Sequence, residues 1–204
     1  MTTSSSLLIR LLRHVNTLSL GAAWASGALT LCSVLLICFD VFARKFLGFN
    51  TGGADELSGY AFAISISWSL AFVVLHRGNV RVDALYHRFP VRFTAFLDWL
   101  SLAVLGVFLA YLTYYASQVA GMSWEMGAVS NSLLGVPLWI PQGLWVLGFV
   151  WMCVVLALML LRASAALVTG DIAAIKELCG VRTTEEEASD EAESGARIVE
   201  SEKS

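Results

Sequence analysis

The sequence predicts an all-α integral membrane protein: four transmembrane helices with an N-terminal amphipathic interfacial helix and a disordered acidic C-terminal tail. Its mean hydropathy of +0.72 with only 14% charged residues is far from the composition of soluble domains. Acidic residues gather at one end, where eight acids face two bases after Arg182. The net charge of −3 is therefore a property of the tail and not of the membrane part.

Residues 1–17 are expected to form a cytoplasmic N-terminus with an interfacial helix. Over 6–15 the leucines and Val15 recur at helical spacing, while Arg10, Arg13 and His14 lie on the other side. This pattern is typical of a short helix in the headgroup plane of an anionic leaflet. A basic anchor that only orients the first span is the alternative, and it stays open. A cleaved signal is disfavoured because the apolar run continues to Phe39.

The four-helix membrane domain is predicted over 18–161. Its spans are expected at about 18–39, 57–75, 96–116 and 139–161, lengths suited to a hydrocarbon core of about 30 Å. In the first span, small residues four apart would let another helix approach closely: Gly21 with Ala25, and Ala23 with Gly27. The second span carries hydroxyls that we interpret as packing groups and not as a permeation path: Ser58, Ser65, Ser67 and Ser69.

Charges cluster between the first two spans. Asp40 and Arg44 are four residues apart and are predicted to pair on a helical extension at the interface. Asp55 and Glu56 precede the second span, where the helix dipole favours carboxylates. An ordinary solvated interface and an ion-pair cluster that fixes the loop both stay open. The loop itself is indicated by turn-forming residues: Gly48, Asn50, Gly52 and Gly53.

The second half of the chain carries fewer signals. Asp98 lies one turn into the third span, so we expect it to reach headgroup water. Pro137 and Pro141 flank the start of the fourth span, where proline is tolerated. Residues 162–204 are expected to be a cytoplasmic tail that is disordered from about 183, because its Glu-, Ser- and Ala-rich composition cannot bury enough apolar surface.

The distribution of basic residues predicts the topology. If the N-terminus is cytoplasmic, eleven of the 13 Lys and Arg residues lie on that side and only Arg44 and Lys45 on the other. The positive-inside rule then places both chain ends in the cytoplasm. The charged cluster from Asp40 to Glu56 and the Trp124–Pro137 loop are expected on the opposite side.

Several classes of function are disfavoured. The three histidines lie outside the predicted spans, so haem ligation within the membrane is not expected. No predicted span holds Asp, Glu or His near its middle, which argues against intramembrane catalysis and proton-driven export. No phosphate-binding loop is present. We expect no catalytic residues, no cofactor and no metal site, and four spans without a polar groove favour a subunit that supports another protein.

The charged stretch also carries a resemblance. Arg44 follows the first span, Gly48 lies in the loop, Glu56 opens the second span, and the run Arg77-Gly78-Asn79-Val80-Arg81-Val82-Asp83 follows it. Over roughly 10–165 the chain resembles the DctQ-type small membrane subunit of tripartite ATP-independent periplasmic (TRAP) transporters. That family more often has His-Ile in place of Asn79-Val80.

The resemblance implies a non-catalytic subunit of a sodium-coupled, binding-protein-dependent transporter for an organic acid, in the bacterial cell inner membrane. The implied partners are a large twelve-span subunit, for which this chain would be a scaffold, and a periplasmic solute-binding protein, which it would help to dock. The candidate interface or docking residues are Arg44, Lys45, Asp55, Glu56, Arg77, Arg81 and Asp83. A stand-alone four-helix membrane protein, either an assembly factor or a quinone-interacting subunit, is the alternative.

Overall fold

The computed structural model describes residues 2–49, 52–76 and 90–170, with three isolated positions in the tail. For residues 2–9, 91 and 92 only the backbone is described. Within these ranges the fold is all-helical: α1 (Thr2–Phe42) continues into a π-helical turn, η1 (Ala43–Leu47), and is followed by α2 (Ala54–Leu75), α3 (Val91–Glu125) and α4 (Trp139–Thr169). Four helices are long and apolar enough to cross a membrane, which confirms the predicted fold class.

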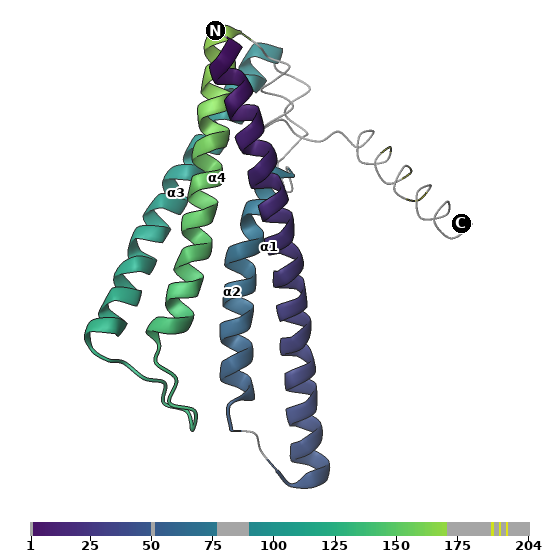
Figure 1. Ribbon diagram of the computed structural model, residues 1–204, viewed down its shortest axis with the longest axis vertical. Helices are drawn as coiled ribbons and strands as arrows, with labels where there is room; N and C mark the ends of the chain where they lie inside the picture. The colour runs from purple at the N-terminus through teal and green to yellow at the C-terminus, as the bar shows by residue number, and fades with distance from the viewer. Residues whose placement is uncertain are drawn as a thin grey trace.

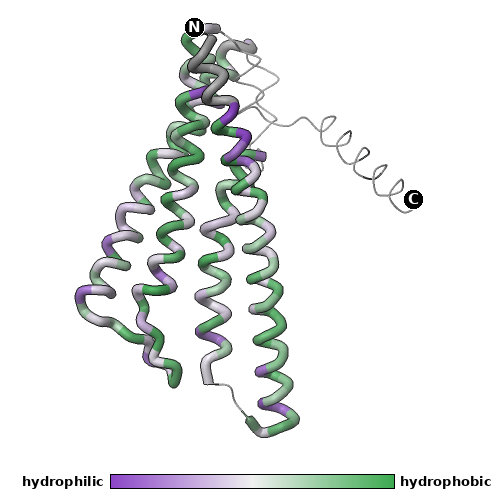
Figure 2. The backbone as a smooth tube through the Cα atoms, viewed as in Figure 1, coloured by the Kyte–Doolittle hydropathy of each residue, from purple (hydrophilic) through white to green (hydrophobic). Residues whose placement is uncertain are grey.

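The four helices form an open layer (Figure 1). The most extensive contacts join α1 to α2, α2 to α4 and α4 to α3, so the order across the layer is α1, α2, α4, α3. This order leaves α3 at one edge, with α4 as its main neighbour. Apolar residues run along all four helices (Figure 2), because the outer faces of the layer are built for contact with hydrocarbon and not with water.

The N-terminus differs from the expectation of a separate interfacial helix. Helix α1 runs from Thr2 to Phe42 without a break, which at 1.5 Å per residue is about 60 Å, twice the hydrocarbon thickness. Leu12 and Val15 are buried in the main core cluster together with α4 residues such as Met159 and Ala163. This packing, with no proline or glycine before Gly21, holds the segment along the axis of the first span.

Beyond Val15, α1 buries mainly small or polar side chains. Ser19, Ser26, Ser33 and Asp40 are all buried and recur every seven residues, a repeat that keeps one face of a helix toward a partner. The Ser33 hydroxyl donates to the Leu29 carbonyl of the same helix at 2.9 Å, while the Ser19 hydroxyl accepts from the Trp151 indole of α4. On α2, Ser58 and Ser65 are buried in the same manner, which confirms the interpretation of these serines as packing groups.

Close helix approach occurs at a different glycine from those expected. A Cβ atom on Gly21 or Gly27 would meet nothing within 4 Å, so the small-residue pairs of α1 do not mark a tight contact. A Cβ atom on Gly148 of α4 would lie 2.3 Å from the Ser67 hydroxyl of α2 and 2.9 Å from the Ser67 carbonyl carbon. Gly148 is therefore the point at which α2 and α4 touch almost backbone to backbone.

Three tryptophan side chains tie α4 to each of the other helices. The indole N–H of Trp68 on α2 donates to the Leu144 carbonyl at 3.0 Å. Trp99 on α3 donates to the Ser164 hydroxyl at 2.9 Å, and Trp151 on α4 donates to the Ser19 hydroxyl at 3.2 Å. These bonds satisfy the indole groups inside the membrane region, where each contributes about 1 kcal/mol or less.

Candidate docking site at the loop end

The end of the layer that carries residues 43–56 and 126–138 is called the loop end here; Figure 1 shows it opposite the N-terminus. Its first part is built by the end of the first helix. The π-helical turn η1 widens the last turn and stops at Gly48, which adopts the left-handed conformation with φ of 65° and donates its N–H to the Ala43 carbonyl. Glycine adopts this conformation without steric cost, so the predicted helix stop at Gly48 is confirmed.

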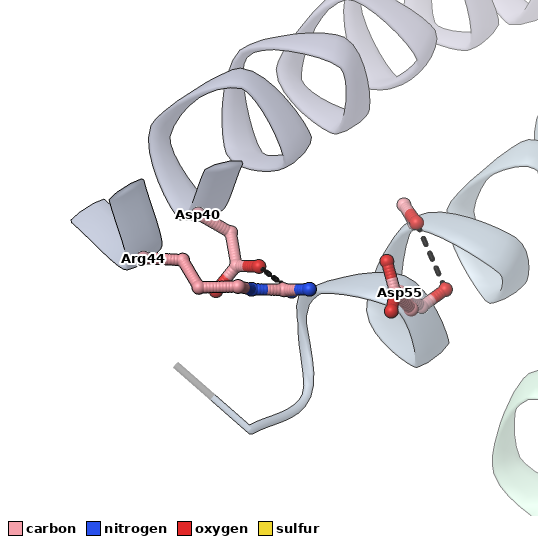
Figure 3. Close-up of polar contacts among 4 residues, drawn as sticks. Asp40, Arg44 and Asp55 are labelled. Atoms are coloured by element: carbon pink, nitrogen blue, oxygen red, sulfur yellow. Dashed lines mark hydrogen bonds and ion pairs between the residues drawn. The ribbon is translucent and has the colours of Figure 1, made fainter. Parts of the chain in front are cut away.

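The predicted pair of Asp40 and Arg44 is present. The Arg44 guanidinium donates to Asp40 Oδ2, and the Asp40 side chain is only 3% exposed while that of Arg44 is 53% exposed. The pair thus joins a buried carboxylate to a half-exposed base. Figure 3 shows the Arg44 side chain reaching across from the end of α1 toward the start of α2, where Asp55 lies. The charged pair of Asp40 and Arg44 is therefore partly enclosed by protein and not simply solvated.

Glu56 opens α2 beside the second loop. Its Oε1 atom accepts a 2.5 Å hydrogen bond from the Tyr60 hydroxyl. The Ser130 and Ser132 hydroxyls face the same carboxylate, yet Glu56 Oε2 is buried and has no hydrogen-bond partner in the part of the chain that the structure describes. Because this oxygen is enclosed by protein, a donor from another molecule does not reach it, and Glu56 contributes to the loop end through its negative charge.

The loop between α3 and α4 is held by its own hydrogen bonds. Ser130 N–H donates to the Val136 carbonyl at 2.9 Å and Leu138 N–H to the Ala128 carbonyl at 3.0 Å. Inside the turn, the Ser132 hydroxyl accepts from the Leu134 N–H at 3.1 Å. Such a loop presents its tip in one conformation, which suits a recognition surface better than a flexible strand would.

The two loops of this end pack on each other. Built on Gly53, a Cβ atom would lie 2.2 Å from the Leu134 side chain, and one built on Gly52 would lie 2.8 Å from Leu133. Gly52 also has a positive φ of 71°. Leu133 itself is 91% exposed. The loop end therefore presents one continuous surface in which an exposed leucine lies next to the charges at the start of α2.

The structure brings some of the predicted site residues together. Arg44, Asp55 and Glu56 all lie at the loop end, and Lys45 is exposed beside them, with its Nζ atom 5.7 Å from the Phe46 ring centroid. Arg77, Arg81 and Asp83 lie outside the described residues. Most of the tail after Gly170 also lies outside them, so its predicted disorder stays a prediction.

Asp98 corrects one sequence interpretation. It was expected to reach headgroup water, but its exposed fraction is 2% and it takes part in a polar interaction within the protein. The reason is that α3 begins at Val91, so residue 98 lies two turns into the helix on a face that also buries Ala95 and Leu102. Burial of an aspartate requires polar partners, and Asp98 is therefore a structural group.

Sequence reasoning missed the contribution of the second loop. Ser130, Ser132 and Leu134 follow no recognisable motif, and only their position in a loop without Lys or Arg could have drawn attention to them. For Gly52 and Gly53 the sequence pattern predicts only a loop. Their lack of side chains also makes room for Leu133 and Leu134, a contact between loops about 80 residues apart that no local pattern encodes.

Within the described residues there is no group of three or more His, Cys, Asp and Glu side chains that could hold a metal ion. Three described cysteines, Cys32, Cys38 and Cys153, are free thiols.

Comparisons with known proteins give one family. The sequence profile of the DctQ component of tripartite ATP-independent periplasmic transporters matches residues 33–166. That match starts in the second half of α1, covers α2 and α3, and ends near the end of α4. Neither a curated protein nor a solved structure matches the chain significantly.

Proposed function

Because the chain belongs to the DctQ family of tripartite ATP-independent periplasmic transporters, we propose that it acts as scaffold and docking subunit of a sodium-coupled, binding-protein-dependent transporter for an organic acid. It is a small membrane component of such a system. The family works in a complex with a large membrane subunit and a periplasmic binding protein, and we assign both partners to this chain. The observation that carries the proposal is the rigid, charged surface at the loop end.

The open layer supports the scaffold role. At one edge of the layer α3 has α4 as its main neighbour, and it exposes a continuous apolar stripe that includes Val104, Val107, Phe108, Tyr111 and Tyr115. These residues follow the i, i+3, i+4 spacing of one helix face. Such a layer widens the fixed part of a larger membrane protein without carrying solute itself. The chain segments 57–75, 99–124 and 139–161 contain no Asp, Glu, Lys, Arg or His.

The loop end supports the docking role. Glu56 places a carboxylate charge at the start of α2, held by the Tyr60 hydroxyl, and Arg44, Lys45 and Leu133 are exposed at the same end of the layer. A charged rim next to an exposed apolar residue is the usual composition of a transient protein interface. We assign this surface to the periplasmic binding protein.

The docking proposal requires the loop end to face the periplasm, with both chain ends in the cytoplasm. The positive-inside rule supports this orientation. Asn131 is exposed in the α3–α4 loop. We expect an Asn131→Cys variant, in a background with the native cysteines replaced by serine, to react with a membrane-impermeant maleimide in intact spheroplasts. A Ser189→Cys variant in the same background should react only after the membrane is opened. The reverse pattern would refute the orientation.

The Glu56→Gln variant tests the docking role. The variant keeps an oxygen acceptor for Tyr60 but removes the negative charge, so the fold should be retained while binding-protein recognition weakens. We expect a tagged Glu56→Gln chain to co-purify with a much larger polytopic protein as the wild type does. Solute uptake in the presence of the binding protein should fall about tenfold, as expected when a central interfacial charge is lost.

Glu125→Gln is the matched control, because Glu125 ends α3 at the same end of the layer but lies outside the Glu56 cluster. Its uptake should equal that of the wild type. Unchanged uptake in Glu56→Gln would remove Glu56 from the docking surface. A wild-type chain that purifies alone, monodisperse and stable would instead overturn the scaffold role and favour the stand-alone four-helix protein.

A further inference from the structure

An apolar groove lies on the outside of the layer, where α1 crosses α2 and α4. Its volume is about 630 Å³. Helix α1 supplies one wall from Thr17 to Leu29, while Trp68 of α2 and Leu144 and Trp151 of α4 supply the opposite wall. Leu18, Gly21 and Ala25 are exposed in the groove, so the described residues leave it open from the side of the membrane.

The groove lining selects an apolar occupant. The two indole N–H groups at its wall already donate to the Leu144 carbonyl and the Ser19 hydroxyl. The Thr17 hydroxyl donates to the Arg13 carbonyl. The donors at the wall are thus satisfied within the protein, and the lining residues include no ionisable side chain. A polar ligand would lose hydrogen bonds to water here without replacing them.

The length of the groove matches an acyl chain. The wall from Thr17 to Leu29 rises about 18 Å, close to half of the roughly 30 Å hydrocarbon core and thus to one leaflet. A single acyl chain of a lipid in that leaflet runs in the same direction.

Basic residues continue the same stripe of α1 beyond the groove. Arg10 and His14 precede Leu18, Gly21 and Ala25 at spacings of three and four residues, which places all five on one helix face. Arg10 and His14 are both exposed. Because side chains in a helix lean toward its N-terminus, these two groups extend away from the apolar groove and toward the lipid headgroups.

We propose that this groove is a binding site for an anionic phospholipid of the leaflet that the N-terminal end of α1 faces. One acyl chain lies between α1, Trp68 and Trp151, and the phosphate contacts Arg10 and His14. Two observations support a lipid as the occupant: the basic residues beyond one end of the groove, and the length of its apolar wall. The site lies far from the loop end and does not depend on the docking role.

The test is lipid counting by native mass spectrometry on the full chain, purified with its partners in mild detergent and titrated with phosphatidylglycerol or phosphatidylethanolamine. Gly21→Leu adds an apolar side chain to the groove lining, and nothing lies within 4 Å of a Cβ atom there. Gly27→Leu is the matched control on another face of the same helix, outside the groove lining, where a Cβ atom also meets nothing within 4 Å.

We expect the wild type and Gly27→Leu to bind one phosphatidylglycerol with preference over phosphatidylethanolamine. Gly21→Leu should weaken this binding at least tenfold. An Arg10→Gln/His14→Gln variant should lose the preference for phosphatidylglycerol, by about fivefold for the charge of Arg10. Equal lipid binding by Gly21→Leu and Gly27→Leu would overturn the proposal. So would equal binding of both lipids by the wild type, or a partner helix cross-linked to a cysteine at position 21.

Discussion

Replacing Gly148 by alanine is expected to push α2 and α4 apart and to lower the free energy of unfolding by about 1–3 kcal/mol, the usual cost of overpacking. The new Cβ atom would lie 2.3 Å from the Ser67 hydroxyl, 2.8 Å from Ser67 Cβ and 2.9 Å from the Ser67 carbonyl carbon. A hydroxyl can rotate away, but the backbone atom cannot. Because the α2–α4 contact joins the two halves of the layer, its loss should also impair assembly with the large subunit.

Gly143→Ala is the matched control for Gly148→Ala. It lies in the same helix, and a Cβ atom there meets nothing within 4 Å. It should therefore show only the gain in helix propensity of alanine over glycine, up to about 1 kcal/mol. The measurement is the thermal unfolding midpoint of each variant in one detergent, together with recovery of the large subunit. A Ser67→Gly change should partly rescue Gly148→Ala. Equal midpoints for the two alanine variants would show that α2 and α4 tolerate the added methyl group.

The Arg44→Gln variant is expected to destabilise the protein by about 1–3 kcal/mol. This range is below the 3–5 kcal/mol typical of a broken, fully buried ion pair, because the Arg44 side chain is about half exposed and solvent screens its charge. The Asp40 carboxylate, which is 3% exposed, would lose its cationic partner. Asp40→Asn removes that carboxylate charge and should therefore cost less than Arg44→Gln.

A double-mutant cycle tests the coupling of Asp40 and Arg44. The double variant Asp40→Asn/Arg44→Gln should be more stable than the sum of the single effects predicts, because it no longer holds a buried negative charge that has lost the Arg44 cation. Lys45→Gln is the control, since Lys45 is the adjacent exposed base and its ammonium group lies over the Phe46 ring; its unfolding midpoint should stay near the wild-type value. Additive single effects would mean that the two side chains do not depend on each other.

Local patterns were sufficient for the helices and for several single features of the site. The Asp40–Arg44 pair follows from a four-residue spacing along one helix, and the loop after Gly48 follows from the preference of glycine for positive φ. Each depends on residues within one turn of one another, and such interactions are encoded locally. The burial of Asp98 was not predicted, because a position near a helix start does not reveal what packs on that face.

Length, hydropathy and charge spacing act along the chain, and they are sufficient to identify the family, the four apolar helices and the charged stretch between the first two of them. Four other features appear only in the folded chain: the order of helices across the layer, the contact at Gly148, the packing of Leu133 and Leu134 on Gly52 and Gly53, and the groove beside Trp151. These features depend on which helix faces meet. In a chain that is apolar on almost every face, hydropathy does not distinguish a face that packs on protein from one that packs on lipid.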